Sequence, residues 1–239
     1  MVLETRNLCK TYRGNTVVDH ISLQLHLHEV VGLLGANGAG KTTTFNMIVG
    51  LTKPSSGEIW CNKRNITRYP IYKRARLGIG YLPQEPSIFT RMTVEDNLKA
   101  ILETLNLSQE ERQKRLDQLL VGLQIDHLRH RKATPLSGGE RRRVEIARTL
   151  VTSPSFLLLD EPFSGLDPKS VEDMRLIITQ LREVGIGVLV TDHNVVETLK
   201  IIDRAYIVNE GKLLFSGSPD DAVANEAVRE AYLGQEFGD

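Results

Sequence analysis

The hydrophobic positions in the first 84 residues follow strand-like patterns. Apolar residues alternate with polar ones from residue 21 to residue 27, which is the period of a strand with one face in water. Residues 30–34 (VVGLL) are apolar on both faces, as expected for a central strand of a parallel sheet. A glycine-rich turn follows, and the pattern predicts a helix from about Lys41 to near Gly50. Two further strands are predicted, at residues 57–60 and 79–82.

The pattern becomes helical between residues 85 and 152. Thr93 with Asp96 has the spacing of a helix N-cap, and Ser108 with Glu111 has that of a capping box. The run 109–118 is rich in charges of both signs, which is typical of a solvated helix face. We therefore expect a helical lobe inserted between two stretches of alternating strands and helices.

That alternation returns after Pro154. Strands are predicted at residues 156–159 and 187–190, with a helix from Ser170 to about Val184 between them. A hairpin is predicted over residues 205–215, turning at 209–211, and an acidic, alanine-containing helix ends the chain.

These elements predict an α/β fold with a parallel-sheet core, an antiparallel β subdomain and an inserted helical subdomain. We expect a single domain over residues 1–239, because the chain has no internal repeat, low-complexity tract or long linker. Its expected parts are a core at 1–84 and 153–239, a helical subdomain at 85–152, and a C-terminal helix and tail at about 218–239.

Composition narrows the class of protein. The chain carries 30 basic and 30 acidic residues, and this balance argues against nucleic acid as the main partner. No apolar run follows the N-terminal charges, and the longest apolar stretches are too short to span a bilayer. We therefore expect a soluble, cytoplasmic protein that reaches a membrane through a partner. Cys9 and Cys61 match no metal-binding spacing, so we interpret them as idle thiols in a reducing compartment.

Residues 35–43 (GANGAGKTT) fit the phosphate-loop pattern G-x-x-x-x-G-K-[ST] between a predicted strand and a predicted helix. Glycines let successive backbone N–H groups face one anion, and the N-terminus of the helix adds its positive end. Lys41 would reach the β- and γ-phosphates, and the Thr42 hydroxyl is a suitable ligand for Mg²⁺. The predicted nucleotide-binding residues here are Gly35, Ala36, Asn37, Gly38, Ala39, Gly40, Lys41, Thr42 and Thr43.

A pair of acidic residues follows the predicted strand 156–159. Open α/β sheets place their ligands at the carboxyl ends of the strands, where Asp160 and Glu161 would lie. Asp160 suits the ligand shell of Mg²⁺, and Glu161 suits a general base or a group that orients water. Together with the phosphate loop, the pair predicts hydrolysis of a nucleotide.

The segment Leu136–Glu140 (LSGGE) precedes a helical run and offers a second anion site. A chain with one phosphate loop has little use for such a site unless it serves the nucleotide of another subunit. With this segment the chain resembles the ABC ATPase family, whose signature reads LSGG-[QE]. The resemblance covers essentially the whole chain, and the family's motifs occur in the family's order.

The resemblance implies a P-loop NTPase fold, ATP as substrate with Mg²⁺, and a head-to-tail dimer in which Ser137, Gly138 and Gly139 close over the γ-phosphate of the partner's ATP. It also implies that Tyr12 stacks on adenine, that Gln84 contacts Mg²⁺ and senses the membrane partner, and that His193 contacts the γ-phosphate. Catalytic roles thus fall to Glu161, His193 and Gln84, and metal binding to Thr42, Gln84 and Asp160. The chain departs from the family where Gly165 stands in the segment 164–167 (SGLD), a position at which alanine is common.

Several local strings resemble one branch of the family, the lipopolysaccharide-export ATPase (LptB) family of Gram-negative bacteria. These strings are residues 81–85 with 87–89, 136–148, 191–194, 204–208 and 232–237. The resemblance implies a homodimer, or a heterodimer with a paralogue, that drives the export of lipopolysaccharide from the cytoplasmic face of the inner membrane. Two integral-membrane permease subunits would dock near Phe89 and Arg91, although Phe89 could equally fill the core of the small lobe.

Two alternatives remain open at this point. ATPases of branched-chain amino-acid importers have a similar size and signature, so the permease must distinguish the two kinds of transporter. The second alternative is an ABC ATPase that acts on nucleic acid or ribosomes. Such proteins usually carry a long coiled-coil insertion or two cassettes in one chain, and this sequence shows neither. We interpret the run Arg141–Arg143 as a solvent-exposed (wet) helix face. We assign no role to the five histidines other than His193.

Overall fold

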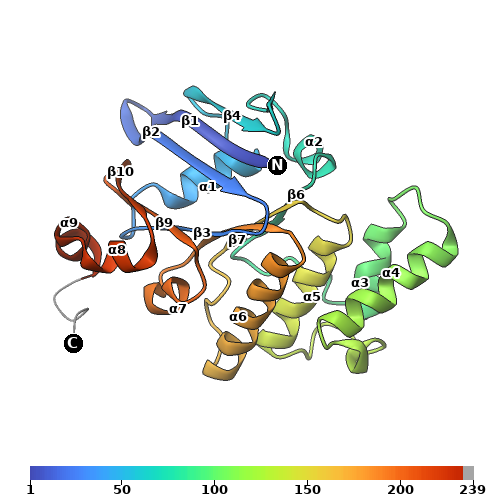
Figure 1. The fold of residues 1–239 in the computed structure, drawn as a ribbon. Coiled ribbons are helices and arrows are strands. Elements are labelled where there is room, and N and C mark those ends of the chain that lie inside the picture. Colours follow the sequence, from blue (N-terminus) through green and yellow to red (C-terminus); the bar gives the residue numbers. More distant parts are fainter. Residues whose placement is uncertain (234–239) are drawn as a thin grey trace.

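The computed structural model describes residues 1–233 and contains two sheets with helices around them (Figure 1). The larger sheet has six strands. Their spatial order is β10 (Lys212–Gly217), β9 (Arg204–Asn209), β3 (Val30–Leu34), β8 (Gly187–Thr191), β7 (Phe156–Asp160) and β6 (Ile79–Leu82). All neighbours pair in parallel except β10, which forms the predicted antiparallel hairpin with β9.

Every residue of β3, β7 and β8 is buried. This explains why these strands are apolar on both faces, as the sequence indicated for β3. The carboxyl ends of the parallel strands meet at one edge of the sheet, where the phosphate loop and the acidic pair follow β3 and β7.

The smaller sheet is antiparallel, with the strand order β2 (Asn15–His26), β1 (Val2–Tyr12), β4 (Ser56–Cys61) and β5 (Arg64–Asn65). The alternating pattern predicted only residues 21–27 of β2 and none of β1. The reason is that β-bulges break the register of this pair, and Asn7 and His20 have positive φ angles of 46° and 56°. Alternation cannot be followed through such a break.

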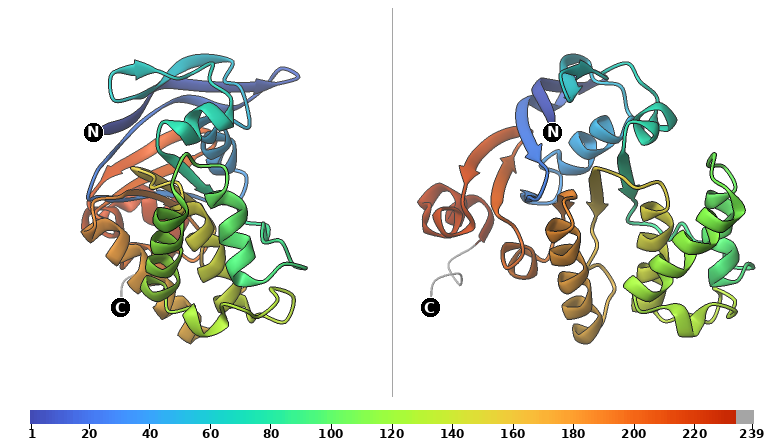
Figure 2. Two further views of the ribbon diagram at one scale, coloured as in Figure 1. Left: turned by 90° about the vertical axis from the view of Figure 1, so that its right-hand side faces the viewer. Right: turned by 45° about the vertical axis from the view of Figure 1, so that its right-hand side comes forward.

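Helix α1 (Lys41–Val49) lies between the two sheets (Figures 1 and 2). Its Phe45 and Met47 belong to one buried cluster with Ile21 of β2 and Leu158 of β7. This cluster holds the helix that begins in the phosphate loop against both sheets.

The C-terminus of α1 is capped by a buried arginine of α2 (Ile71–Arg76), a helix that the sequence analysis did not predict. The guanidinium of Arg74 donates hydrogen bonds of 2.6 Å to the carbonyls of Met47 and Ile48, and burial lowers its pKa to about 10. A cation at these last carbonyls complements the helix dipole. The contact ties α2 to the end of α1.

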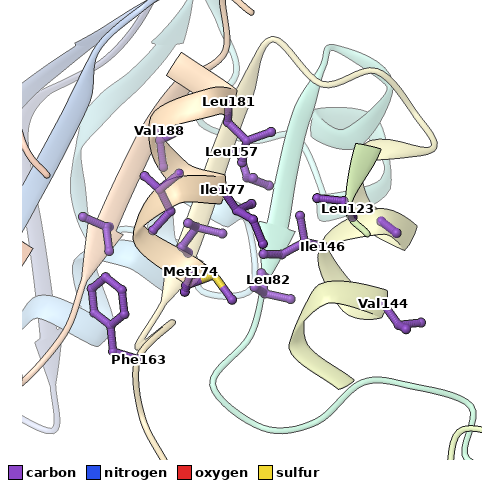
Figure 3. Packing of buried hydrophobic residues seen from close by; sticks show 14 of the residues in the cluster. Leu82, Leu123, Val144, Ile146, Leu157, Phe163, Met174, Ile177, Leu181 and Val188 are labelled. Carbon is purple, nitrogen blue, oxygen red and sulfur yellow. The ribbon is translucent and has the colours of Figure 1, made fainter. Parts of the chain in front are cut away.

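The lobe between β6 and β7 contains three α-helices, α3 (Val94–Leu102), α4 (Gln109–Gly122) and α5 (Gly138–Leu150), and a short 3₁₀ helix (Asp126–Leu128) between α4 and α5. The predicted N-caps are present, with Thr93 accepting from Asp96 N and Ser108 forming a capping box with Glu111. Helix α5 joins the lobe to the larger sheet, because Ile146 belongs to the same buried cluster as Leu82 and Leu157 (Figure 3).

Helix α6 (Pro168–Glu183) begins two residues before the predicted start, because Asp167 caps it by accepting a hydrogen bond from Ser170 N. The short helix α7 (Val195–Leu199) follows β8. The single helix predicted at the C-terminus is wrong, since Asn225 adopts an extended conformation and divides the segment. Its parts are α8 (Pro219–Ala224), α9 (Glu226–Val228) and a π-helical turn (Arg229–Leu233).

Among residues 1–233, no helix has the length and hydrophobicity needed to cross a membrane. The tail at 234–239, including most of the string 232–237, lies outside the described residues.

Candidate nucleotide site

The phosphate loop, residues 35–43, leaves β3 through conformations that require glycine. Gly35 has a φ of 148°, and a Cβ there would come within 2.1 Å of the Val208 carbonyl oxygen. Gly40 has a φ of 101°, and its Cβ would meet the Val17 carbonyl oxygen at 2.5 Å. Positive φ and close backbone contact both exclude a side chain. The loop is thus packed against β9 on one side and β2 on the other.

Lys41 folds back over this loop. Its Nζ donates hydrogen bonds to the carbonyl oxygens of Gly35 (2.7 Å) and Ala36 (2.9 Å). Burial lowers the pKa of Lys41, although Glu161 and Asp160 nearby favour its charged form. The Lys41 side chain is therefore half-enclosed, its donors are held by two carbonyl oxygens, and the negative charges of two carboxylates act on it. The Thr42 side chain, one residue later, is exposed.

Asp160 and Glu161 end β7 in different environments. Asp160 is 5% exposed, and burial together with the charge of Glu161 raises its pKa to about 6. Its Oδ2 accepts a long hydrogen bond of 3.5 Å from Tyr81, whose own pKa burial raises to about 12. A buried carboxylate with so weak a partner favours a bound cation.

The Glu161 carboxylate joins two other predicted site residues. Its Oε2 accepts a hydrogen bond of 2.8 Å from Gln84 Nε2 and lies 3.2 Å from His193 Nδ1. Because a carboxylate accepts hydrogen bonds, Nδ1 is the donor of the second bond. Glu161 has a φ of 46°, a conformation that is uncommon for a non-glycine residue outside functional turns. Residues far apart in the sequence thus converge on one oxygen atom.

Asp192 fixes the position of His193, and the sequence analysis did not single it out. It is fully buried, and its two oxygens accept from Phe163 N (2.9 Å) and Asn194 N (2.8 Å). Burial raises its pKa, while these hydrogen bonds and His193 favour the ionised form. A carboxylate directly before a histidine at a strand end was the available signal.

The signature segment, Leu136–Glu140, lies outside this cluster of side chains. Ser137 caps α5 in a capping box with Glu140 and is exposed, as is Gly138. Gly139 is buried against α6, where a Cβ would meet Ser170 Oγ at 2.4 Å. The free N-terminus of α5 therefore faces solvent rather than the phosphate loop of its own chain. The S-x-x-E spacing was a capping-box signal that the sequence analysis did not use.

The interpretation of Arg141–Arg143 as a wet helix face is wrong for Arg142, which is 7% exposed. Its guanidinium donates to the carbonyl oxygens of Pro83 (2.7 Å) and Asp160 (3.0 Å) and pairs with Glu145 at 3.3 Å. One face of α5 turns inward at this point, so a single member of the run is buried while its neighbours stay partly exposed. Arg142 links α5 to both the segment after β6 and the end of β7.

Phe89 does not fill the core of the small lobe, because 45% of its surface is exposed. Arg148 stacks on its ring at 4.4 Å and donates a 2.5 Å hydrogen bond to the Ser87 carbonyl. A groove of about 290 Å³ lies beside this pair and is bordered by Ile71, Tyr81, Pro83, Ser87, Ile101 and Arg148. Arg91 is exposed on the same connection.

Tyr12 lies at the end of β1, where half of its surface is exposed and Lys10 Nζ is 4.8 Å from its ring centroid. An exposed ring is free to stack on a planar ligand. Tyr12 lies outside the hydrogen-bonded cluster around Glu161.

The profile of the "ABC transporter" family matches residues 18–164, and that of the "Branched-chain amino acid ATP-binding cassette transporter" matches residues 212–238. Among curated proteins, the chain is 56% identical over 236 residues to the lipopolysaccharide export system ATP-binding protein LptB of Acidithiobacillus ferridurans, covering 99% of this chain and 98% of the relative. It is 52% identical to the protein of the same name from Escherichia coli K12, covering 98% of each.

Solved structures share the fold. An ATP-binding cassette of an ABC transporter in its ADP conformation aligns with a TM-score of 0.88 at 27% identity, covering 98% of this chain and 99% of that one. A dimeric cassette in a post-hydrolysis state, bound to ADP and Pi, aligns with a TM-score of 0.79 at 25% identity, covering 91% and 98%. The two-sheet arrangement with an inserted helical lobe is therefore that of these cassettes, as the sequence predicted.

Proposed function

Since the chain belongs to the ABC transporter ATP-binding family, we propose that it is the ATP-hydrolysing motor of a lipopolysaccharide exporter. The observation that carries the proposal is the near-complete alignment, at 52–56% identity, with ATP-binding proteins of lipopolysaccharide export systems. The convergence of Gln84 and His193 on one oxygen of Glu161 supports an intact hydrolytic site.

The residues of the phosphate loop bind the phosphates of ATP. Its N–H groups and the N-terminus of α1 face the β- and γ-phosphates, and Lys41 exchanges its carbonyl partners for phosphate oxygens. In this exchange the charge of Lys41, which burial disfavours, gains negatively charged partners. Tyr12 offers its exposed ring to the adenine.

The donor set fits Mg²⁺. Asp160 is buried and its pKa is raised, so its ionised form gains from a cation. The Thr42 hydroxyl and the Gln84 amide oxygen are the hard oxygen ligands that complete the set. When bound, Mg²⁺ neutralises charge on the phosphates.

Glu161 acts as the general base. Its Oε2 takes a proton from the attacking water, and the Gln84 amide orients the carboxylate by donating to the same oxygen. His193 donates from Nδ1 to Glu161, so its Nε2 can donate to a phosphate oxygen only when the ring is protonated or releases Glu161. Asp192 Oδ1 lies 3.5 Å from the same Nδ1.

Two copies of the chain complete the site. The exposed N-terminus of α5, with Ser137, Gly138 and Gly139, binds the γ-phosphate held by the partner's phosphate loop. The likeness to a dimeric cassette supports this arrangement. ATP closes the dimer, and hydrolysis reopens it.

The groove beside Phe89 and Arg91 receives helices of two membrane permease subunits, which places the motor on the cytoplasmic face of the inner membrane. Exposed Phe89 offers an apolar contact, and Arg148 holds it in place. Contacts from α5 to Pro83 and Ser87 connect this groove to the segment that carries Gln84.

Purification from membranes tests the transported substrate. The tagged chain is expressed in its host, native membranes are gently solubilised, and co-purifying proteins and lipids are identified by mass spectrometry. Two related permease subunits with bound lipopolysaccharide are expected. If hydrophobic amino-acid permeases co-purify in their place, the assignment as a transporter ATPase stands and lipopolysaccharide is refuted as the transported substrate.

An importer of branched-chain amino acids is the second candidate. The match of residues 212–238 to the branched-chain amino-acid cassette profile favours it, but that match covers only the end of the chain. The relatives with lipopolysaccharide export names align over 98% or more of the chain. We therefore prefer the exporter.

A further inference from the structure

A β-bulge brings Cys9 of β1 opposite two residues of β2. Leu8 pairs with Ile21 and Lys10 pairs with Val18, so Cys9 faces both Asp19 and His20. Adjacent residues of a regular strand point to opposite faces, but a bulge re-aims one of them. His20 has a φ of 56°, uncommon for a non-glycine residue, and the turn brings its ring back towards Asp19.

The three side chains gather their ligand atoms at one point. Cys9 Sγ, a carboxylate oxygen of Asp19 and a ring nitrogen of His20 all lie within 4.8 Å of one another. His20 Nδ1 is 2.5 Å from Asp19 Oδ1, and the His20 N–H donates to Cys9 Sγ at 3.2 Å. The thiolate is the form of cysteine that binds metals, and the backbone N–H places a hydrogen-bond donor beside this sulfur.

Burial is graded across the cluster. Cys9 is 7% exposed, Asp19 is half-buried and His20 is exposed, so a cation would enter from the His20 side and meet the sulfur behind. Lys212 Nζ lies 3.6 Å from Asp19 Oδ2 and leaves Oδ1 to the histidine. One sulfur, one imidazole nitrogen and one carboxylate oxygen form a donor set of the kind that binds Zn²⁺.

We propose that Cys9, Asp19 and His20 form a Zn²⁺ site in the antiparallel sheet, separate from the nucleotide site. Three protein ligands leave a fourth position for water or for a group from another molecule. The role is independent of which substrate the transporter carries. It also replaces our interpretation of Cys9 as an idle thiol.

The site is connected to the phosphate loop through the backbone. Asp19 N donates to the Gly211 carbonyl at 2.8 Å, and Gly211 N donates to the Ala39 carbonyl at 3.0 Å. A cation that fixes Asp19 therefore fixes the β9–β10 turn, which in turn holds the phosphate loop. Zn²⁺ at this position would reduce the freedom of the loop.

The test is metal binding by the full chain without nucleotide, in excess Mg²⁺ to occupy oxygen-only sites. Competition with a chromophoric chelator measures the affinity for Zn²⁺, and Co²⁺ substitution reports thiolate ligation by its charge-transfer absorption. One Zn²⁺ per chain is expected, with the charge-transfer band present. His20→Ala should weaken Zn²⁺ binding at least about 10-fold, since even outer-shell changes cost ~10–100-fold. Cys9→Ser should abolish the Co²⁺ band.

Matched controls separate the site from general effects. His26→Ala removes another exposed histidine of β2, and Cys61→Ser removes the other buried cysteine; both should bind Zn²⁺ as the unaltered chain does. His20 is exposed, so its variant should fold even if Cys9→Ser does not. No stoichiometric Zn²⁺ binding, unchanged affinity in His20→Ala, or an equal loss in His26→Ala would each overturn the proposal.

Discussion

Asp160 and Glu161 are neighbours in the chain, but their carboxylates lie in different environments. Asp160 is buried and its charge is poorly compensated by protein groups, whereas Glu161 is held by Gln84 and His193. The fold thus holds the proposed base in place and leaves the charge of the proposed metal ligand poorly compensated in the absence of a cation.

Asp160→Asn should stabilise the metal-free protein at neutral pH. The pKa of Asp160 is about 6 when folded and 3.8 when unfolded, so its ionisation lowers stability as the pH rises from about 4 to above 6. The free energy of unfolding of the variant, relative to the unaltered chain, should therefore increase over this range by up to about 3 kcal/mol. Urea denaturation in EDTA at several pH values measures it. Asp220→Asn, at an exposed position, is the control, and a pH-independent difference would contradict the prediction.

Glu161→Gln should lower the rate of ATP hydrolysis by at least about 100-fold while ATP binding is retained, because the amide cannot take a proton. ATP should also hold the variant in a closed dimer, seen by light scattering. Glu183→Gln, on the exposed end of α6, should hydrolyse ATP at the normal rate. Normal turnover in Glu161→Gln would rule out its role as the base.

Sequence reasoning reached these residues because their motifs are local. Gly35–Thr43 and Asp160–Glu161 each lie in one continuous stretch between predictable elements. Their mutual contacts could not be predicted, since the bonds of Gln84 and His193 to Glu161 span 77 and 32 residues of sequence. Asp192 was missed because its hydrogen-bond partners are backbone N–H groups, and its place directly before His193 at a strand end was the one signal that the sequence offered.

At the level of elements, α5 carries three connections. Its N-terminus presents the signature segment, its Arg142 bonds the carbonyl oxygens of Pro83 and Asp160, and its Arg148 holds Phe89. One helix therefore touches the signature, the acidic strand end and the groove. A rotation of α5 would change all three together.

Arg142→Ala should lower the free energy of unfolding by about 3 kcal/mol, because it leaves Glu145 buried without its cation. Arg141→Ala is the matched control, since Arg141 is partly exposed and makes one long bond of 3.4 Å, and it should cost less than about 1 kcal/mol. Urea denaturation of both variants decides the matter. Equal effects would mean that burial does not distinguish the two arginines.

Elements with a regular hydrophobic pattern were predicted from the sequence, and those with an interrupted pattern were not. Strands β3, β7 and β8 are buried on both faces, and their continuous apolar runs marked them as strands. The β1–β2 pair has several register shifts, so its alternation fails at the bulge that gathers Cys9 and His20. Deviations from pattern coincide with the proposed metal site.

At the scale of the whole molecule, the proposed dimer assigns the signature segment and the phosphate loop of one chain to different sites. Tethered dimers that carry Ser137→Arg and Glu161→Gln test this. With the two changes in different chains, both fall on the same composite site, and the other site stays intact. With both in one chain, each site loses a component.

The dimer with the two changes in different chains should keep the ATPase activity of a dimer with one altered site. The dimer with both changes in one chain should be at least about 100-fold less active than the unaltered dimer. A tethered dimer with Ser137→Arg alone is the reference. If the doubly altered chain beside an unaltered one were the more active pair, each chain would be completing its own site.

The order of strands in the larger sheet has a consequence for synthesis on the ribosome. Strand β3 ends at Leu34, but its neighbours β8 and β9 begin only at Gly187 and Arg204. At ~5–20 residues per second, the wait is on the order of ten seconds or more. During that time a wholly apolar strand has no partner, and the smaller sheet, whose strands end by Asn65, can pair first. The nascent chain should therefore depend on chaperones until β9 emerges, and synonymous codons that slow translation before residue 187 should lower the yield of folded protein.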